Sequence, residues 1–431
     1  MLCGILFLFL GLSLGVGYGR RQGQIWHPIG MRKSVRAWVA KQFNIRHVRI
    51  FVAVARCGSF KSVAGDFRLS QAAIAQAVGR LELKLGERLF ERSATGLLLS
   101  EAGQILYHRS IRALTHLDPA LERAGVRLRN CATTPQLAAV SALVDAESFT
   151  LAAKRLNLSH STIHRAVAEL EDVADEPLFN RVGIKIEATR FSVELARTYK
   201  LAFGELEQAK VEIGSLRAQV TGRLCIAISS QFPQALVVKA LRALRRDGDD
   251  YAIDFVDVPP DGVVKQLTNG HVDVALSCLQ DHGPPPELRI LASGQRKLKI
   301  AWRIDENAAS ERLFDAMANR PWALPEESTA DFETTKLWFA AAGLPMPQCR
   351  VVTTNTELLK ALVMNGEFAV VLPTEEFSGV NDVRYVPIDG CVSLHVLIAR
   401  RDWQPSSAQK RIIELLSMAF ASDFDAITAA P

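Results

Sequence analysis

Apolar and polar positions follow two different rhythms along this chain. Between residues 45 and 218, apolar side chains recur every three or four positions, which predicts amphipathic helices. From Gly222 onward, short β-branched runs alternate with helical stretches, which predicts an α/β region with a mostly parallel sheet. The expected strands are Leu224–Ile228, Ala252–Val258, Val272–Leu276, Leu298–Trp302, Val351–Thr353, Phe368–Leu372 and Val392–Ala399.

The helical region contains one small unit twice. Residues 45–92 align without a gap with residues 135–181 at an offset of 89, with about fifteen identical positions. In the first copy we expect three short helices, with Ser59 capping the second and Ser70 capping the third. Two short helices joined by a tight turn, the second with small or amide side chains at its exposed start, indicate a helix-turn-helix. The second helix of such a motif can enter the major groove of DNA.

A short hairpin is expected to follow this motif. Leu89 and Phe90 anchor a turn, and Leu97–Leu99 form an apolar strand, so the hairpin is interpreted as a wing. Arg92 is then placed to reach a phosphate group. Ser100 is expected to cap the helix that comes next.

The positive charge is concentrated in one block. Residues 31–130 hold 18 basic and 7 acidic residues, whereas residues 131–221 hold 10 and 12, and residues 222–431 hold 21 and 27. A focused basic block is the electrostatic footprint of a polyanion, most often nucleic acid, and a solvated basic face is the alternative.

Both copies resemble the winged helix-turn-helix of LysR-type transcriptional regulators. The first carries GSF at 58–60, SQ at 70–71, LFER at 89–92 and SEAG at 100–103, and the second carries SF at 148–149, LFNR at 178–181 and SHST in place of the family's SQPA at 159–162. The remainder, from GRLCIAISS through NGHVDVAL to NGEFAVVLP, resembles the LysR effector-binding domain. The family normally has one winged domain, so the tandem arrangement is unusual.

The resemblance implies an α+β multidomain fold. Two α-helical winged helix-turn-helix domains would precede a two-lobed, periplasmic-binding-protein-like α/β effector-binding domain. The expected segments are an apolar leader at 1–30, winged helix-turn-helix 1 at 45–103, a connecting helix at 104–130, a divergent winged helix-turn-helix 2 at 134–190, a linker or dimerisation helix at 191–218 and the effector-binding domain at 222–425.

Candidate DNA-binding residues lie at the exposed start of each third helix and in each wing. They are Ser70, Gln71, Ala72, Ala75, Gln76 and Arg92 in the first copy, and His160, His164, Arg165 and Arg181 in the second. A glutamine can bond adenine bidentately. Acidic residues at 169, 171, 172, 175 and 176 would repel phosphate, so the first copy is expected to dominate DNA contact. His160 and His164 have a spacing seen in metal sites, but no third ligand is nearby and no metal is predicted.

The helix after the second copy carries an apolar seam at 3.5-residue spacing. Its candidate dimerisation residues are Leu195, Tyr199, Leu206, Ile213 and Leu216. Such a seam predicts pairing with another helix, and the resemblance implies that two protomers meet there in a homodimer or homotetramer. Core packing within one chain is the alternative. The equivalent helix after the first copy is expected to kink at Pro119, with Asp118 as a new cap.

Two passages in the α/β region echo each other and suggest two lobes with a cleft between them. Each has Asn-Gly at a helix end followed by a buried strand, at 269–270 and at 365–366. The candidate effector-binding residues are Ser229, Ser230, Thr353, Thr354 and Asn355. Hydroxyl groups and free amides at helix N-termini suit a carboxylate or another small anion, and plain helix capping is the alternative.

Enzyme classes find little support. The chain has no GxSxG, GxxxxGK[ST], HExxH or GxGxxG motif, so no catalytic residue and no cofactor is predicted. Its seven cysteines include no CxxC pair, which favours a reducing compartment and a cytoplasmic protein. Cys225 and Cys278 allow a redox-sensing pair, although buried inert cysteines are far more common.

The pattern therefore predicts a sequence-specific DNA-binding transcriptional regulator with double-stranded DNA and a small, anionic effector as partners. One alternative is a small-molecule-binding or enzymatic α/β protein whose N-terminal repeats make protein–protein contacts. Another is a membrane-tethered regulator, held by the apolar residues 2–17, although that run is shorter than the roughly 20 residues needed to span a bilayer. Translation from Met31 or removal as a signal would take the leader out of the working protein.

Overall fold

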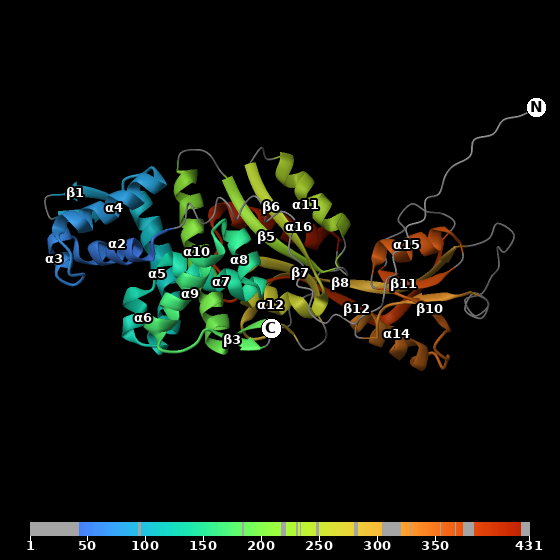
Figure 1. The fold of residues 1–431 in the computed structure, drawn as a ribbon. Coiled ribbons are helices and arrows are strands. Elements are labelled where there is room, and N and C mark those ends of the chain that lie inside the picture. The colour runs from blue at the N-terminus through green and yellow to red at the C-terminus, as the bar shows by residue number, and fades with distance from the viewer. Residues whose placement is uncertain are drawn as a thin grey trace, which may run out of the picture.

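The computed structural model describes residues 43–423, with gaps at 94–95, 183–184, 217–220, 230–231, 233, 247–249, 280–282, 304–319, 328, 354, 367 and 374–382. Helical elements fill the N-terminal half and a mixed sheet flanked by helices fills the C-terminal half (Figure 1). The leader at 1–30 lies outside the described residues. No helix within the described part of the chain is both long and apolar enough to cross a membrane.

The first repeated unit is a winged helix-turn-helix. Its elements are α2 (Ile45–Cys57), α3 (Phe60–Ala64), α4 (Gln71–Leu85), β1 (Phe90–Ser93) and β2 (Gly96–Leu99). The Ser70 hydroxyl accepts from the Ala73 amide at 3.1 Å and so caps α4, as predicted. The predicted Ser59 cap is wrong: Ser59 precedes α3, but its side chain makes no capping hydrogen bond. A helix of five residues must then be held by packing.

The second unit repeats these elements in the same order. They are α7 (Thr134–Ala146), α8 (Phe149–Leu156), α9 (His160–Ala174), β3 (Phe179–Val182) and β4 (Lys185–Ala188). Three left-handed backbone positions recur at the offset of 89: Gly58 and Glu147, Arg68 and Asn157, and Gly86 and Asp175. A positive φ is uncommon for residues other than glycine, so this recurrence shows that the two copies share one backbone path.

Each unit runs into a long linker helix. Ser100 caps α5 (Glu101–Arg123), and Thr189, its equivalent, caps α10 (Arg190–Ser215). Helix α5 continues through Pro119, so the predicted new start at this point is wrong. The Asp118 carboxylate is not a cap, because it binds Arg49 of α2 at 2.6 Å instead. A short helix, α6 (Val126–Cys131), then leads to the second unit.

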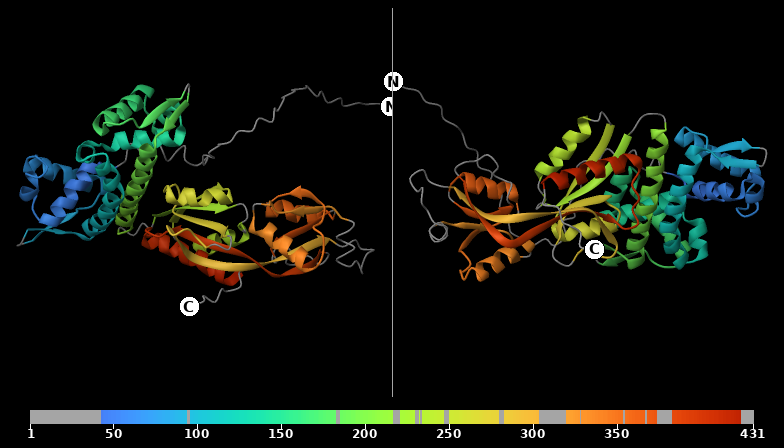
Figure 2. Two further views of the ribbon diagram at one scale, coloured as in Figure 1. Left: turned by 90° about the horizontal axis from the view of Figure 1, so that it is seen from below. Right: turned by 180° about the vertical axis from the view of Figure 1, so that it is seen from behind.

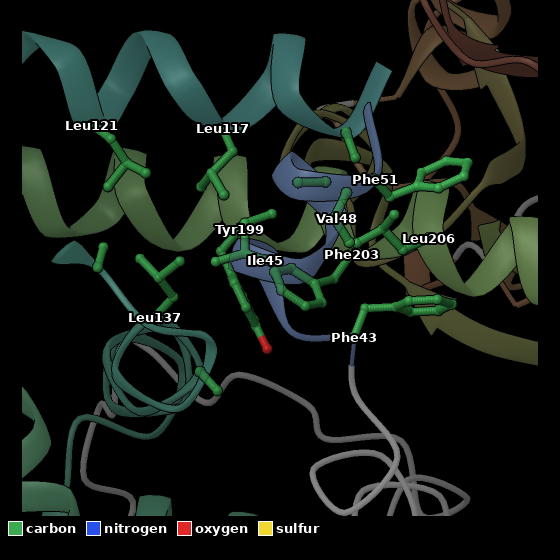
Figure 3. Close-up of a cluster of buried hydrophobic side chains, with 14 of the residues drawn as sticks. Phe43, Ile45, Val48, Phe51, Leu117, Leu121, Leu137, Tyr199, Phe203 and Leu206 are labelled. Carbon is green, nitrogen blue, oxygen red and sulfur yellow. The ribbon is translucent and has the colours of Figure 1, made fainter. Parts of the chain in front are cut away.

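The two units and their linker helices form one body, residues 43–215, which we call the head. A single continuous apolar core runs through it (Figure 3). Helices α5 and α10 lie antiparallel: Arg123 near the end of α5 pairs with Glu194 near the start of α10, and Arg112 pairs with Glu205 further along.

This packing overturns the predicted dimer seam. The seam residues Leu195, Tyr199, Leu206 and Ile213 have no exposed surface within a single chain. They are covered by α5 and by the units themselves, so they are not available to a second protomer. Only Leu216, just beyond the end of α10, is exposed, at 42%. The apolar pattern indicated a helix partner correctly, but the partner is the duplicated helix of the same chain.

The C-terminal region contains one eight-stranded sheet in the order β10-β9-β11-β8-β12-β7-β5-β6. The strands are β5 (Thr221–Ser229), β6 (Asp250–Val258), β7 (Val274–Leu279), β8 (Leu288–Arg303), β9 (Trp322–Leu324), β10 (Cys349–Val352), β11 (Ala369–Pro373) and β12 (Val383–Arg400). The helices are α11 (Gln234–Arg246), the 3-10 turn Pro260–Gly262, α12 (Val263–Thr268), α14 (Ala330–Ala341), α15 (Thr356–Met364) and α16 (Ser407–Asp423).

Two lobes share this sheet. Strands β5, β6 and β7 form the first lobe, β9, β10 and β11 form the second, and the long antiparallel strands β8 and β12 run through both (Figure 2). The sheet is therefore mixed rather than mostly parallel, because β8 and β12 are antiparallel to their neighbours in the middle. The two Asn-Gly pairs end α12 and α15 as predicted, and their glycines, Gly270 and Gly366, adopt the left-handed conformation with φ of 69° and 82°.

Candidate nucleic-acid interface and effector domain

Helix α4 presents a polar face at its N-terminal end. Gln71, Ala72 and Gln76 are exposed and Ala75 is half-buried, as the helical spacing predicted. The opposite face, made of Ile74, Ala77, Val78 and Leu81, is buried against the rest of the first unit. The buried face thus determines which side of α4 faces outward. That outward side carries two amide side chains near the start of the helix.

The wing is held to this helix by a partly buried carboxylate contact. Glu82 of α4 accepts from the backbone amide of Leu89 at 2.9 Å, which ties the hairpin to the helix. Arg92 lies in β1 opposite Leu97, and its side chain is exposed. An exposed arginine on a hairpin beside an exposed helix start is placed to contact a phosphate backbone.

Two arginines, Arg80 of α4 and Arg46 of α2, lie close enough to His47 to affect its titration. The pKa of His47 in α2 is lowered by its burial and then by the positive charges of Arg80 and Arg46. Arg80 is an exposed residue of α4 that the sequence reasoning did not select. The helical spacing could have identified Arg80 as a candidate DNA-binding residue, because it lies four residues after Gln76, one turn along the same face of α4.

Helix α9 presents a different set of side chains at the corresponding place. His160 and His164 lie beside the ring of Phe149, with ring centroids 5.5 and 5.2 Å away. Arg165 is exposed and pairs with Glu169 at 2.7 Å. Of Arg181 only the backbone, in β3, is described. Among the described residues, no group of three His, Cys, Asp or Glu side chains could hold a metal ion.

Several acidic side chains of the second unit are occupied by structural partners. Glu171 accepts from the Leu178 and Phe179 amides at 2.8 and 3.3 Å, as Glu82 does in the first unit. Glu169 accepts from Arg165 and Gln136, and these hydrogen bonds lower its pKa. These hydrogen bonds hold the carboxylates in place without removing their negative charge, so weaker phosphate binding by this unit stays a prediction.

The candidate effector residues are only partly described. Ser229 is buried at the end of β5. The Thr353 hydroxyl accepts from the Asn355 amide at 3.1 Å, and the Asn355 side chain caps α15 by accepting from Leu358 at the same distance. These contacts are ordinary helix capping, which was the alternative to effector binding at these residues. Ser230 and Thr354 lie outside the described residues.

The effector-binding domain contacts both linker helices, which the sequence reasoning missed. Arg109 of α5 donates to the backbone oxygen of Gln404 at 3.0 Å and pairs with Glu205 of α10 at 2.7 Å. Lys200 of α10 binds Asp145 of α7 at 2.6 Å and His271 of the effector-binding domain at 2.8 Å. Single charged residues on long helices carry no sequence signal for such distant partners.

The two cysteines near the strands cannot pair. In the register between β5 and β7, Ile226 lies opposite Val274, so Cys225 and Cys278 are offset by five positions, about 16 Å along the sheet. A disulfide needs Cα atoms within about 7 Å. Burial, with the nearby charges of Asp273 and Asp254, also raises the pKa of the Cys225 thiol to about 12. In this conformation the pair therefore forms no disulfide, and the structure gives the redox-sensing alternative no support.

Comparison with known families matches this division of the chain. The family described as "Bacterial regulatory helix-turn-helix protein, lysR family" matches residues 45–104 and again residues 135–191. The family described as "LysR substrate binding domain" matches residues 217–421. The first pair of matches corresponds to the two winged units, and the last corresponds to the eight-stranded sheet and its helices.

Individual relatives are named as regulators. The HTH-type transcriptional regulator GalR of Pseudomonas putida is 21% identical over 339 residues, 78% of this chain and 85% of that protein. The HTH-type transcriptional regulator BudR of Klebsiella aerogenes is 40% identical over 81 residues, 19% of this chain and 57% of that protein. Full-length OxyR of Pseudomonas aeruginosa has a TM-score of 0.48 and 17% identity, covering 66% of this chain and 93% of OxyR.

The family matches do not support the enzymatic or protein-contact alternatives. The family matches cover well over half of the chain and coincide with the winged units and the two-lobed domain that the structure contains. The chain therefore belongs to the LysR family of DNA-binding transcriptional regulators, and its C-terminal half is their effector-binding domain.

Proposed function

We propose that this protein controls transcription by sequence-specific DNA binding through α4 and the first wing. The observation that carries the proposal is the exposed N-terminal face of α4 with Gln71 and Gln76, together with the exposed Arg92 on the wing that Glu82 ties to the same helix. The two amides suit base edges in the major groove, and the arginine suits the phosphate backbone. The excess of basic residues in this part of the chain supports the same assignment.

The test replaces Gln71 and Gln76 together with alanine. We expect discrimination between a specific and a random duplex to fall about tenfold or more, because each bidentate contact is worth roughly 1–3 kcal/mol. Salt-driven affinity for random DNA should change little. Gln104→Ala, an exposed glutamine on α5, is the matched control. Equal discrimination by the double variant and the wild type would contradict the assignment.

We further propose that a small anionic effector, held between the two lobes, sets the activity. The proposal is supported by two lobes joined through β8 and β12, each with a helix that begins after a strand end, α11 after β5 and α15 after β10. The partial positive charge at such helix starts favours a carboxylate, although Asn355 already caps one amide of α15. Contacts from the first lobe to α5, α7 and α10 give the domain a direct path to the head.

The effector proposal is tested with a panel of small mono- and dicarboxylates. Binding is measured by calorimetry on the full chain and on the variant with Ser230→Ala and Thr354→Ala. We expect a carboxylate that shifts DNA binding of the wild type to lose affinity in the variant. Thr268→Ala, whose hydroxyl bonds to its own helix, is the control. Unchanged affinity in the variant would contradict the assignment of the effector site to Ser230 and Thr354.

Assembly into a homodimer or homotetramer stays part of the proposal, through a surface other than the buried seam. Sedimentation of the full chain measures it directly. A monomer over the whole accessible range of protein amounts would contradict it.

A further inference from the structure

The two winged units meet at equivalent residues. Ile45 and Thr134 occupy the same place in their copies, 89 residues apart, and the Ile45 amide donates to the Thr134 hydroxyl at 3.0 Å. The same hydroxyl donates to the Phe43 carbonyl at 3.0 Å. Contact between the same position in two copies is the mark of an isologous, two-fold interface, because only residues near a two-fold axis meet their own equivalents.

The linker helices obey the same two-fold relation. Helix α10 begins 89 residues after α5, and the two equivalent helices pack antiparallel, as a two-fold axis across them requires. Equivalent side chains also share the core. All four residues of two equivalent pairs, Val48 with Leu137 and Leu117 with Leu206, belong to the one apolar core (Figure 3), and the members of each pair are 89 residues apart. The head is thus arranged as a dimer of winged units built from one chain.

This relation determines where the two recognition helices lie. The axis that carries the first unit onto the second also carries α4 onto α9. The outward positions of α4 map onto exposed positions of α9: Gln71 onto His160 and Gln76 onto Arg165. Winged and helix-turn-helix dimers use such two-fold heads to read two half-sites of one duplex.

The two helix starts differ in chemistry, so the half-sites must differ too. The first offers two glutamine amides, whereas the second offers His160, His164 and Arg165. All three can donate to acceptors on bases or phosphates. The acidic side chains nearest to them are occupied: Glu171 by backbone amides, and Glu169 by Arg165 and Gln136. The second unit therefore presents exposed donors at the start of α9 beside carboxylates that stay negatively charged, with Arg165 shared between Glu169 and the outer face.

We propose that a single chain binds an asymmetric, two-part DNA site. Helix α4 reads one half and α9, through His160, His164 and Arg165, reads the other. This inference rests on the proposed DNA-binding function and extends it to the second unit. In this arrangement one polypeptide supplies both recognition helices, which otherwise come from the two chains of a dimer.

The experiment uses the full chain and a library of random-sequence duplexes. Rounds of selection with the wild type yield a bound sequence, whose protection from hydroxyl radicals is then mapped. We expect two different protected motifs. A variant with His160, His164 and Arg165 replaced by alanine should lose protection of one motif and at least tenfold in affinity. The Gln71→Ala, Gln76→Ala variant should lose discrimination at the other motif.

The outcomes separate the inference from the function on which it rests. Two identical motifs that both survive the α9 triple substitution would show that two chains each use only their first unit, and would overturn the inference. No enrichment of any sequence by the wild type would overturn the DNA-binding function itself. Circular dichroism and the thermal midpoint of each variant check that these exposed substitutions leave the fold intact.

Discussion

Glu205 joins the two linker helices by binding Arg109 and Arg112, which also donate to backbone oxygens of the effector-binding domain. Its removal gives a sharp test of the head. Its carboxylate lies 2.7 Å from Arg109 and 2.8 Å from Arg112, and its side chain is only 8% exposed. Burial tends to raise its pKa, but hydrogen bonds and charge from Arg112 and Arg109 outweigh this and hold the pKa below its ordinary value. Glu205→Gln keeps the volume but leaves both guanidinium groups without this negative charge.

The expected loss follows from the burial of the pair. Breaking a buried ion pair by removing one partner costs about 3–5 kcal/mol. Arg109 keeps its second partner Glu212, so we expect the lower end, about 3 kcal/mol. For a folding unit of this size the thermal midpoint should fall by about 6–12 °C. Because the folded pKa is lowered, the contribution of Glu205 is present above its unfolded pKa and is lost as the pH falls through its folded pKa.

Thermal unfolding of the full chain, followed by circular dichroism, measures the effect. Glu207→Gln is the matched control, since Glu207 lies two residues away, is 33% exposed and pairs loosely with Lys210 at 3.8 Å. Its substitution should change stability by no more than about 0.5 kcal/mol. A Glu205 variant as stable as the Glu207 variant would refute the buried network. The difference between wild type and the Glu205 variant should also shrink in acid.

Three further changes test other parts of the structure. Gly103→Ala should destabilise the first wing by more than about 2 kcal/mol in urea unfolding, because a Cβ there would lie 2.1 Å from the Leu89 carbonyl oxygen, whereas Ser192→Ala at the equivalent position should be tolerated better. Arg92→Ala should weaken binding to all duplexes and lower the salt slope by about one unit in a fluorescence titration, and an unchanged slope would rule out a phosphate contact. Hydrogen bonds from His271 and the charge of Lys200 overcome burial and lower the pKa of Asp145 to about 2, so Asp145→Asn should cost about 2 kcal/mol at neutral pH. That cost should vanish between about pH 4 and pH 2, and a cost independent of pH would contradict the ion pair.

The repeated unit could be predicted because its signals are local. Ser70 as a cap, the buried face of α4 and the hairpin carrying Arg92 each depend on residues within a few positions of one another. Local hydrogen bonds and helical spacing leave a pattern in the sequence. The offset of 89 then carried the same prediction to the second unit, where Ser159 caps α9 as expected.

The predictions of the dimer seam and of a mostly parallel sheet failed because each depended on which distant segment of the chain packs against a given helix or strand. The seam through Leu206 showed that an apolar face had to be covered, but periodicity does not say by which helix. In the same way, the strand runs did not show that β8 and β12 would each span both lobes. Contacts such as Arg109 with Gln404, almost 300 residues apart, leave no periodic trace.

The contact between Ile45 and Thr134 changes what governs the formation of the head. A dimer assembled from separate chains dissociates on dilution, so its ability to bind DNA depends on protein concentration. Here both halves are joined by one polypeptide and meet in a unimolecular step, so the head persists at any concentration at which the chain is folded. The same linkage prevents exchange of halves with related proteins in the cell, since each first unit is already matched to its own second unit.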